Sequence, residues 1–342
     1  MQTRTLGRTG RDVSVIGLGT WQLGADWGDV DDTAASAILD AAHAAGVTMF
    51  DTADVYGDGR SESTIGRWLA ANPGSGVFVA TKMGRRGPQE HDRFTLAAFR
   101  AWTDRSRQNL GVDTLDLVQL HCPPTSVFAD DEVFDALDTL VDEGAIAAYG
   151  VSVETCDEAL AAIARPGVAS VQIILNAFRL KPLDAVLPAA AAAGVGIIAR
   201  VPLASGLLSG RYTTQTTFAE DDHRTFNRHG EAFDVGETFS GVDFATGVEA
   251  AQEFAAIAPS FVTGTTGSAT NGGADGQPST SQLALAWIVR QPGVSTVIPG
   301  ARSVDQADAN AAAGSIVLDD GVDAAVRDLY DRDFRETVHS RW

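Results

Sequence analysis

The chain has 342 residues, 44 % of them hydrophobic, and a formal net charge of −20 at pH 7. This length suits one large barrel as well as two average domains, and it can bury a sizeable core. The negative charge argues against a nucleic-acid partner, because phosphate contacts need clustered cations. No apolar run reaches the length of a membrane span, and the first nine residues lack the apolar stretch of a secretory signal. We therefore expect a cytoplasmic protein with no nucleic-acid or membrane partner, a monomer or small homo-oligomer.

Two residue types are scarce in this chain. Its two cysteines, Cys122 and Cys156, give neither a disulfide framework nor a metal-ligand spacing, so we expect no metal. Lysine occurs only as Lys82 and Lys181, and every other basic side chain is arginine. The acidic surplus has two explanations: the nucleotide bias of a GC-rich genome, or a surface adapted to high salt. In either case, a position that keeps lysine is notable.

Short apolar runs alternate with longer amphipathic stretches, the pattern of repeated βα units around a parallel sheet. Before the first run, residues 4–13 contain the turn-like segment TLGRTGRD, which predicts a hairpin at the bottom of a barrel. The runs predict strands over residues 13–19, 47–50, 77–81, 115–120, 145–151, 170–175, 195–199 and 295–299. The stretches between them predict helices over residues 32–46, 62–71, 96–111, 131–144, 155–164 and 183–194.

Eight continuous apolar runs favour a closed (β/α)₈ TIM barrel over an open sheet, in one domain spanning residues 1–342. A long excursion from Pro202 to about Val294 separates the seventh strand from the eighth. Within it we expect a helical piece near residues 248–258, a mobile low-complexity loop over about 263–281 and a helix over 281–291. Helices over 304–314 and 319–334 follow the eighth strand, the latter as a C-terminal helix.

The residues that follow successive strands carry the chemistry, because a barrel of this kind builds its active site at the carboxyl ends of its strands. Asp51 and Tyr56 follow the second strand, Lys82 the third and His121 the fourth. The next three strands deliver Ser152, Asn176 and Arg200. Because neighbouring strands lie about 4.8 Å apart, the first group can meet at one point.

These four side chains suit proton transfer to a carbonyl oxygen. A tyrosine hydroxyl has a pKa near 10, and a lysine ammonium beside it would lower that pKa. A carboxylate would keep the lysine charged and oriented, and a histidine would hydrogen-bond the carbonyl group. Taken singly, Asp51 could be a structural ion-pair partner, Tyr56 a loop aromatic and His121 a structural histidine. The set as a whole is what predicts catalysis.

The segments FDTADVYG (50–57), ATKMG (80–84), LVQLHCP (117–123) and IPGARSVDQADAN (298–310) resemble the aldo-keto reductases. The resemblance extends over almost the whole chain, beginning with GLGTWQLG at residues 17–24. It implies a (β/α)₈ barrel without a Rossmann fingerprint and an oxidoreductase that uses a nicotinamide cofactor. It also implies that Tyr56 is the proton donor, that Lys82 and Asp51 tune it, and that His121 orients the carbonyl.

The same resemblance implies where the cofactor binds. The nicotinamide carboxamide is expected at Ser152, Gln172 and Asn176, although the family commonly has asparagine where this chain has Val153. Arg200 takes the place of a stacking aromatic, as in the subgroup that the motif ARVPLASG resembles. Residues 202–211 would wrap the pyrophosphate and residues 300–310 the adenosine end. The expected contacts are Thr20, Ser152, Gln172, Asn176, Arg200, Pro202, Leu203, Ser205, Gly206, Leu207, Ser209, Arg211, Gly300, Arg302, Gln306 and Asn310.

A solvated loop arginine is the alternative interpretation of Arg302, but as a candidate for a 2′-phosphate it favours NADP(H) over NAD(H). The expected substrate is a small carbonyl or alcohol, with Trp21, Trp27 and Cys122 in its pocket. A Cys122–His121 nucleophilic pair is disfavoured, because adjacent strand residues point to opposite faces. Phe226, Phe233 and Trp342 either close over the site or pack in the core.

Two other kinds of function stay open. The chain could be a cofactor-binding, redox-sensing or regulatory subunit with little turnover, since a retained cofactor site does not prove catalysis. A metal-dependent barrel hydrolase is disfavoured, because the sequence lacks the paired histidines and carboxylates of such sites.

Overall fold

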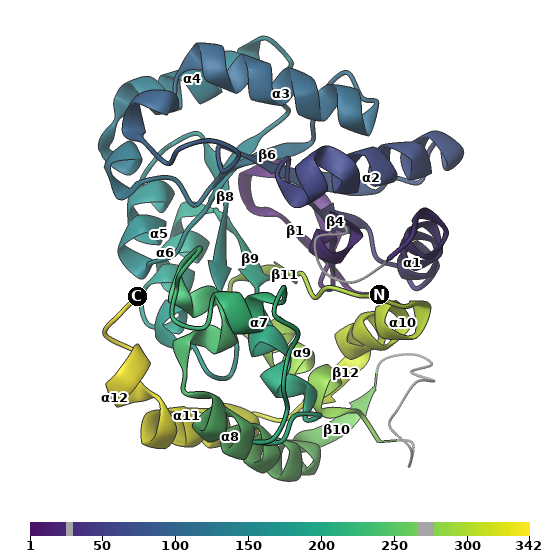
Figure 1. Cartoon of the computed structure of the whole chain (residues 1–342), viewed down its shortest axis with the longest axis vertical. Coiled ribbons are helices and arrows are strands. Elements are labelled where there is room, and N and C mark those ends of the chain that lie inside the picture. The colour runs from purple at the N-terminus through teal and green to yellow at the C-terminus, as the bar shows by residue number, and fades with distance from the viewer. Residues whose placement is uncertain (25–29, 266–276) are drawn as a thin grey trace.

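The computed structural model of this chain describes residues 1–24, 30–265 and 277–342. Eight parallel strands form one sheet in the order β11-β9-β8-β7-β6-β5-β4-β3. Two parallel bridges, from Ile16 to Val297 and from Gly19 to Gly300, join the two edges of this sheet. The sheet is therefore closed, and helices surround it (Figure 1). The predicted (β/α)₈ barrel is confirmed.

The barrel strands are β3 (Leu18–Gly19), β4 (Met49–Asp51), β5 (Phe78–Met83), β6 (Leu117–His121), β7 (Tyr149–Ser152), β8 (Val168–Ile174), β9 (Gly196–Arg200) and β11 (Val294–Val297). The other strands are β1 (Thr3–Thr5), β2 (Asp12–Ser14), β10 (Val262–Thr265) and β12 (Ile316–Leu318). The helices are α1 (Asp32–Ala44), α2 (Arg60–Ala71), α3 (Leu96–Leu110), α4 (Asp131–Asp142), α5 (Cys156–Ile163), α6 (Val186–Ala193), α7 (His223–Phe226), α8 (Phe244–Ile257), α9 (Thr280–Arg290), α10 (Val304–Ala312), α11 (Gly321–Asp333) and α12 (Arg335–Val338).

Several helices begin where the sequence supplies a capping side chain. The carboxylate of Asp31 accepts the backbone N–H of Ala34 at the start of α1. Thr155 and Ser279 each form a capping box, at the starts of α5 and α9. Such caps satisfy backbone donors that have no partner inside the helix. The starts of these three helices are therefore set locally by the sequence.

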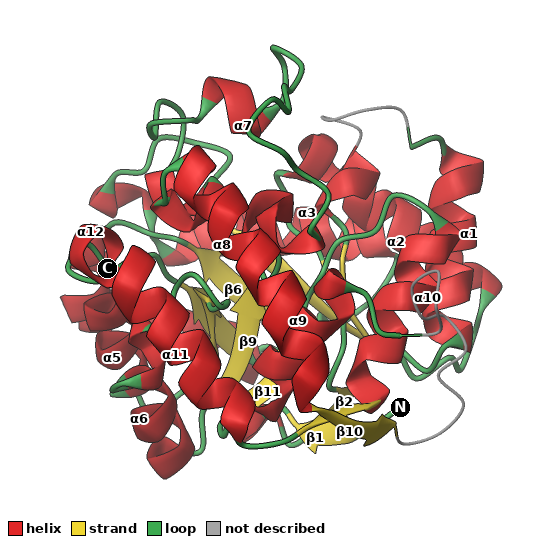
Figure 2. Ribbon diagram, turned by 90° about the horizontal axis from the view of Figure 1, so that it is seen from below, coloured by secondary structure: helices red, strands yellow, loops and turns green. Residues whose placement is uncertain are grey.

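The predicted N-terminal hairpin closes the lower end of the barrel. Strands β1 and β2 pair antiparallel. Leu6, in the turn between them, and Val13, in β2, are fully buried. Both side chains pack inside the barrel with Met49, Phe78, Ala80, Leu117, Ile198 and Ile298. Gly7 lies so close to β9 that a Cβ atom would be 2.1 Å from the backbone nitrogen of Gly196. Figure 2 shows this hairpin at one end of the barrel and α7 with its loops at the other.

Toward the carboxyl ends of the strands, the side chains that point into the barrel are polar instead of apolar. Because alternate strand residues point to the same face, Phe78, Ala80 and Lys82 of β5 all point inward. The strand pairing aligns Lys82 with Gln119 of β6, and His121 lies two residues further along that strand. The polar residues therefore cover the apolar layer at one end of the barrel.

The excursion between β9 and β11 contains more structure than the sequence predicted. The helical piece expected near 248–258 is α8, which begins earlier, at Phe244. The segment expected to be a mobile loop over 263–281 begins with β10, which pairs antiparallel with β12, and ends inside α9. Residues 266–276 of that segment lie outside the described residues. The short β10–β12 sheet was not predicted because each strand has a single partner far away in sequence.

Candidate active site

Strand register brings Asp51 and Lys82 together. Asp51 ends β4 and pairs with Ala80 of β5, so the next inward residue of β5 is Lys82. Lys82 is 1 % exposed, and its ammonium donates to the Asp51 carboxylate and, at 2.9 Å, to the carbonyl oxygen of Thr52. Burial opposes the charge on Lys82, but Asp51 and Tyr56 outweigh it and raise the pKa of this lysine. The predicted Asp–Lys pair is a fixed, charged couple.

Tyr56 lies in the loop that follows β4, at the start of the short 3₁₀ helix η3 (Tyr56–Gly59). Gly57 has a φ of 58° and approaches Gly24 so closely that a Cβ atom would be 2.0 Å from the carbonyl oxygen of Gly24. This contact holds the loop against the end of η2 (Trp21–Gly24) and points Tyr56 toward the barrel. The Lys82 Nζ atom lies 5.2 Å from the centroid of the Tyr56 ring.

The balance of effects on Tyr56 differs from the sequence expectation. The Lys82 ammonium acts as predicted and lowers the pKa of the Tyr56 phenol, but burial raises it more. The net pKa is above the ordinary value of tyrosine, since burial removes the water that would stabilise a phenolate. In this structure Tyr56 is therefore a protonated hydroxyl at neutral pH.

His121 completes the group at the end of β6. Its ring is 5 % exposed and its centroid lies 6.0 Å from that of Tyr56, with the ring planes at 85°. Burial and then the charges of Arg85, Lys82 and Arg200 lower the pKa of His121 well below its usual value. Among the described residues its Nδ1 atom has no hydrogen-bond partner. The site thus holds a neutral imidazole beside the phenol.

Two glutamines hold the other oxygen of the Asp51 carboxylate. Gln172 of β8 donates to Asp51 Oδ2 at 2.8 Å, and Gln119 of β6 donates to the same atom at 3.3 Å. Sequence reasoning missed Gln119, although it lies two residues before His121 in β6 and therefore points to the same face. Gln172 was expected at the nicotinamide carboxamide, and here its amide nitrogen lies on Asp51. A cofactor contact would therefore use its other amide atom or break this hydrogen bond.

Asn176 and Ser152, the other expected carboxamide contacts, lie at the same end of the barrel. The amide nitrogen of Asn176 donates to the Val201 carbonyl oxygen at 2.9 Å and to Ser240 Oγ at 2.7 Å. The hydroxyl of Ser152 lies 3.5 Å from Cys122 Sγ. Asn176 thus ties β8 to the loop after β9, and its contact with a cofactor stays a prediction.

Arg200 lies at the centre of a second charged group, which we call the Arg200 cluster: Arg85, Glu154, Arg200 and Glu237. Arg200 donates to Glu154 at 2.8 Å and lies 3.5 Å from Glu237, which Arg85 also contacts at 3.1 Å. Glu237 belongs to the 3₁₀ helix η8 (Val235–Glu237) in the excursion. All four side chains are at least three-quarters buried. The cluster joins three strand ends to the excursion.

The two carboxylates of the cluster have opposite pKa shifts. Burial alone would raise the pKa of Glu237, but Arg85 and Arg200 outweigh it and hold it at about 2. Burial raises the pKa of Glu154 to about 7, against the pull of Arg200, and the charge of Glu237 adds to that rise. Glu237 touches two guanidinium groups and Glu154 only one, which explains the difference.

Three of the four cluster residues were missed by sequence reasoning. Glu154 follows Ser152 by two residues and Arg85 follows Lys82 by three, so their places after strand ends were a usable signal. Glu237 has no such signal, since it comes from an irregular segment more than thirty residues after β9. Ligand atoms of Cys122, Glu154 and Glu237 lie within 4.8 Å of one another. Arg200 contacts all three residues, so we assign them to the ion-pair network.

The predicted pyrophosphate segment is a strained loop at the end of β9. Val201, Ala204 and Ser205 have φ values of 51°, 47° and 55°, which are rare for residues with side chains. Among the other residues predicted here, Pro202 is buried and Leu207 packs into the core. The Ser209 hydroxyl donates to the carbonyl oxygen of Gly206 at 2.6 Å. A loop that presents its backbone in such conformations fits a ligand held by main-chain atoms.

The predicted adenosine contacts lie at the carboxyl end of β11. Ser303 caps α10, and the exposed Arg302 precedes it, with its backbone N–H donating to Gln306 at 2.8 Å. Asn310 donates to the carbonyl oxygen of Gly300 at 3.1 Å. A capped helix start next to an exposed arginine suits an anionic group. Thr20, by contrast, is fully buried, and its hydroxyl donates to the carbonyl oxygen of Asp51 at 2.9 Å.

Aromatic side chains cover one side of Tyr56. Trp21 is stacked beside it, with centroids 6.0 Å apart and planes at 24°. The Trp21 ring in turn packs against the rings of His223 of α7 and Phe233, with centroid distances of 5.4 Å and 6.4 Å. The excursion therefore lies over the site. The predicted pocket residue Trp27 lies outside the described residues. Cys122 lies on the Arg200 side of the site, where burial raises the pKa of its thiol.

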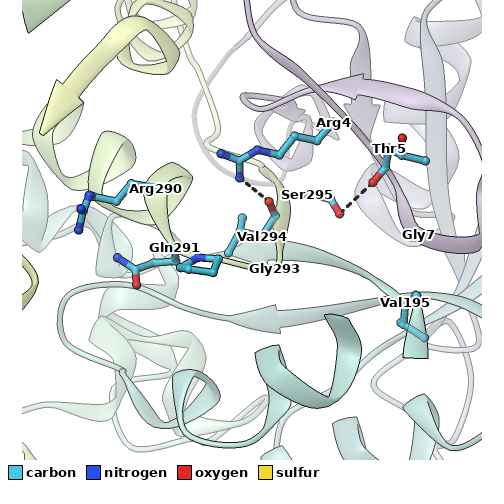
Figure 3. A pocket seen from close by; sticks show the side chains of 11 residues that line it. Arg4, Thr5, Gly7, Val195, Arg290, Gln291, Gly293, Val294 and Ser295 are labelled. Atoms are coloured by element: carbon cyan, nitrogen blue, oxygen red, sulfur yellow. Dashed lines mark hydrogen bonds between the residues drawn. The ribbon is translucent and has the colours of Figure 1, made fainter. Parts of the chain in front are cut away.

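An open pocket of about 400 Å³ lies at the opposite end of the barrel. Figure 3 shows its lining, with Arg4 and Thr5 from β1 beside Val294 and Ser295 of β11. Arg4 contacts the protein itself here, since its Nη1 atom donates to the Val294 carbonyl oxygen at 2.6 Å. Because the four catalytic candidates lie at the carboxyl ends of the strands, this pocket is no part of their site.

Comparison with known proteins decides the family. The family model described as "Aldo/keto reductase family" matches residues 15–331. The chain belongs to the aldo-keto reductase family. An uncharacterized oxidoreductase of Mycobacterium tuberculosis is 34 % identical over 317 residues, which cover 90 % of this chain and 86 % of that protein. The family match and this relative make the chain an oxidoreductase of aldo-keto reductase type.

Two solved structures of aldo-keto reductase type are similar to it. The glycerol dehydrogenase of Gluconobacter oxydans has a TM-score of 0.75 and 29 % identity, covering 94 % of this chain and 93 % of its own. An aldo-keto reductase of Klebsiella pneumoniae in complex with NADPH has a TM-score of 0.68 and 25 % identity, covering 96 % of each chain. No helix in the described part of our chain is long and apolar enough to cross a membrane.

Proposed function

We propose that this aldo-keto reductase interconverts aldehydes or ketones, sugars among them, with alcohols, and that it uses NADPH. One observation carries the proposal: the buried Lys82 ammonium lies between the Asp51 carboxylate and the Tyr56 ring at the catalytic end of the barrel. That arrangement supports a tyrosine that gives up and regains a proton. The bound cofactor would supply or accept the hydride at the substrate carbon.

Tyr56 is the proposed general acid and base. Because burial raises its pKa, the phenol is protonated at neutral pH and can donate to a carbonyl oxygen during reduction. The phenolate left behind is stabilised by the Lys82 ammonium, which Asp51 keeps charged and in place. In the oxidation direction, the phenolate takes the proton from the alcohol. The same three residues therefore serve both directions.

His121 is the proposed orienting group for the carbonyl. A neutral imidazole has one N–H donor, and the low pKa of His121 keeps it neutral near pH 7. Its ring lies next to Tyr56, so a carbonyl oxygen between the two could accept a hydrogen bond from each. Two donors at one oxygen favour the build-up of negative charge there.

The residues around the quartet fit a nicotinamide dinucleotide. Three features lie at the catalytic end of the barrel. They are a buried ring nitrogen of His121 that has no hydrogen-bond partner among the described residues, the strained loop after β9, and the exposed Arg302 beside the start of α10. Arg200 and the loop would hold the nicotinamide and pyrophosphate, and Arg302 a 2′-phosphate. The NADPH in the similar Klebsiella structure supports the choice of NADPH over NADH.

Titration with NADPH and NADH, followed by turnover of an aldehyde and sugar panel, tests this proposal. We expect Tyr56→Phe to bind NADPH as the unchanged protein does and to lose about 10²–10⁴-fold in kcat. Unchanged turnover in that variant would refute the mechanism. Tight NADPH binding with no turnover of any substrate would favour the regulatory alternative. We also expect the protein to be cytoplasmic, as a monomer or small homo-oligomer.

A further inference from the structure

Trp342 anchors the part of the excursion that carries Glu237. We call residues 234–241 the Glu237 segment. The Trp342 indole is 5 % exposed, and its Nε1 atom donates to the Asp234 carboxylate at 3.0 Å. The Arg179 guanidinium lies over the ring, 4.1 Å from the indole centroid. Figures 1 and 2 both place the C-terminus at the edge of the barrel near α5 and α12.

The packing around Trp342 leaves no room for side chains at two positions of the Glu237 segment. A Cβ atom on Gly236 would lie 2.3 Å from Arg179 Nη1 and 2.8 Å from a ring carbon of Trp342. A Cβ atom on Gly241, whose φ is 73°, would lie 2.3 Å from the same ring. Two glycines thus let the backbone contact the indole and the guanidinium directly. The path of this segment is fixed by Trp342.

The same contacts reach the backbone around both acidic residues of the Arg200 cluster. Arg179 donates from Nη2 to the backbone carbonyl oxygen of Glu154. The Glu237 segment is also tied to the loop after β9: Ser205 Oγ donates to the Glu237 carbonyl oxygen at 2.9 Å and accepts the Phe239 N–H at 3.0 Å. Trp342 therefore supports Glu154 through Arg179, and Glu237 through Asp234.

Glu154 and Glu237 hold Arg200 by its edge. Its Nη2 atom donates to Glu154 at 2.8 Å and to the Val153 carbonyl oxygen at 3.2 Å, while Nη1 lies 3.5 Å from Glu237. Guanidinium N–H groups lie in the plane of the group, so these contacts fix that plane. Each of these contacts lies at the edge of the guanidinium, and stacking through the flat face is the use that the family resemblance predicts for Arg200.

We propose that Glu237 and Trp342 are positioning residues, which fix the plane of Arg200 for the nicotinamide end of the cofactor. This inference rests on the proposed function, because it assumes that the chain binds NADPH through Arg200. Neither residue needs to touch the substrate. Glu237 acts through Arg200, and Trp342 acts through the Glu237 segment and Arg179.

The test compares binding of the whole cofactor with binding of its adenosine half. NADPH and 2′,5′-adenosine bisphosphate are titrated against the unchanged chain, Glu237→Gln, Trp342→Ala and Trp342→Phe. We expect Glu237→Gln, which removes the charge that pairs with Arg200, to weaken NADPH binding by about fivefold to tenfold. Trp342→Ala, which removes the support of the Glu237 segment, should have an effect of similar size. Trp342→Phe keeps the stacking on Arg179 but loses the N–H donor to Asp234, so it should recover only part of the affinity. The bisphosphate should bind equally in all.

Glu231→Gln is the matched control, because Glu231 is an exposed carboxylate of the same excursion that accepts the backbone N–H of His229 at 2.8 Å. A purely structural role would lower the melting temperature and leave the NADPH affinity unchanged, and that result would overturn the proposal. If Trp342→Ala does not fold, Glu237→Gln and Trp342→Phe decide the question. If the unchanged chain binds no NADPH, the proposed function fails first, and this inference falls with it.

Discussion

The Lys82–Asp51 couple and the Arg200 cluster are both buried ion-pair networks at the same end of the barrel, yet they are built in different ways. The couple comes from adjacent strands, β4 and β5, whose pairing fixes the two side chains in register. The cluster needs strand ends, a loop and the excursion, held together through Trp342. A site carried by neighbouring strands follows from the fold alone, whereas a site completed by an excursion depends on long-range packing.

The largest effect on stability and activity should come from breaking the Lys82–Asp51 pair. Lys82→Met leaves the Asp51 carboxylate buried without its cation, which should cost about 3–5 kcal/mol of stability, and it should remove nearly all activity. The double variant Asp51→Asn/Lys82→Met should recover much of the stability and none of the activity. Denaturant unfolding and steady-state kinetics measure both. A double variant as unstable as Lys82→Met would show that the couple is not an isolated pair.

The Arg200 cluster should respond to pH in two opposite windows. Glu154 has a folded pKa of about 7, above its unfolded value, so its contribution is present at low pH and lost as pH rises from about 4.5 through 7. Glu237 has a folded pKa of about 2, below its unfolded value, so its contribution is present above about 4.5 and lost as pH falls toward 2. The cluster should therefore be most stabilising near pH 4.5.

Unfolding free energies measured from pH 3 to pH 8 test this shape. Glu154→Gln should flatten the decline above pH 4.5, by at most about 3 kcal/mol at pH 8. Part of the slope should remain, because burial and the charge of Glu62 also raise the pKa of Asp54 to about 7. A profile that Glu154→Gln leaves unchanged would contradict the assignment.

A smaller effect is expected at the far end of the cofactor, away from both networks. Arg302→Ala removes an exposed cation and should lower the preference for NADPH over NADH by about tenfold, the loss of one charged hydrogen bond to a phosphate. The kcat should stay the same, because the proposed role of Arg302 is to bind the 2′-phosphate, which takes no part in proton or hydride transfer. Ratios of kcat/KM for the two cofactors give the answer, and an equal loss for both would remove Arg302 from phosphate binding.

The smallest effect concerns the surface. If the net charge of −20 reflects salt adaptation, activity should hold or rise as salt increases, because screening weakens repulsion among surface carboxylates. The buried couple and cluster should be insensitive to the same change. Activity that declines steadily from low salt upward would favour the genomic explanation for the acidic composition.

Sequence patterns were sufficient to predict the barrel and to place the four catalytic candidates at one end of it. Eight apolar runs became eight barrel strands, and the residues after three of them, with Tyr56 in the following loop, came together as predicted. The physical reason is local: strand alternation and parallel pairing place consecutive strand ends side by side, whatever the rest of the chain does. The direct signal was Lys82, one of only two lysines in a chain that otherwise uses arginine.

The tertiary structure alone decided the balance of charge and the closure of the site. Burial raises the pKa of Tyr56 more than Lys82 lowers it, whereas two guanidinium groups lower the pKa of Glu237 more than burial raises it. Neither result can be predicted from the order of the residues. Glu237 and Trp342 reach Arg200 only because the excursion and the end of the chain pack against each other. Such contacts join residues separated by tens to hundreds of positions, so their energies depend on the complete fold.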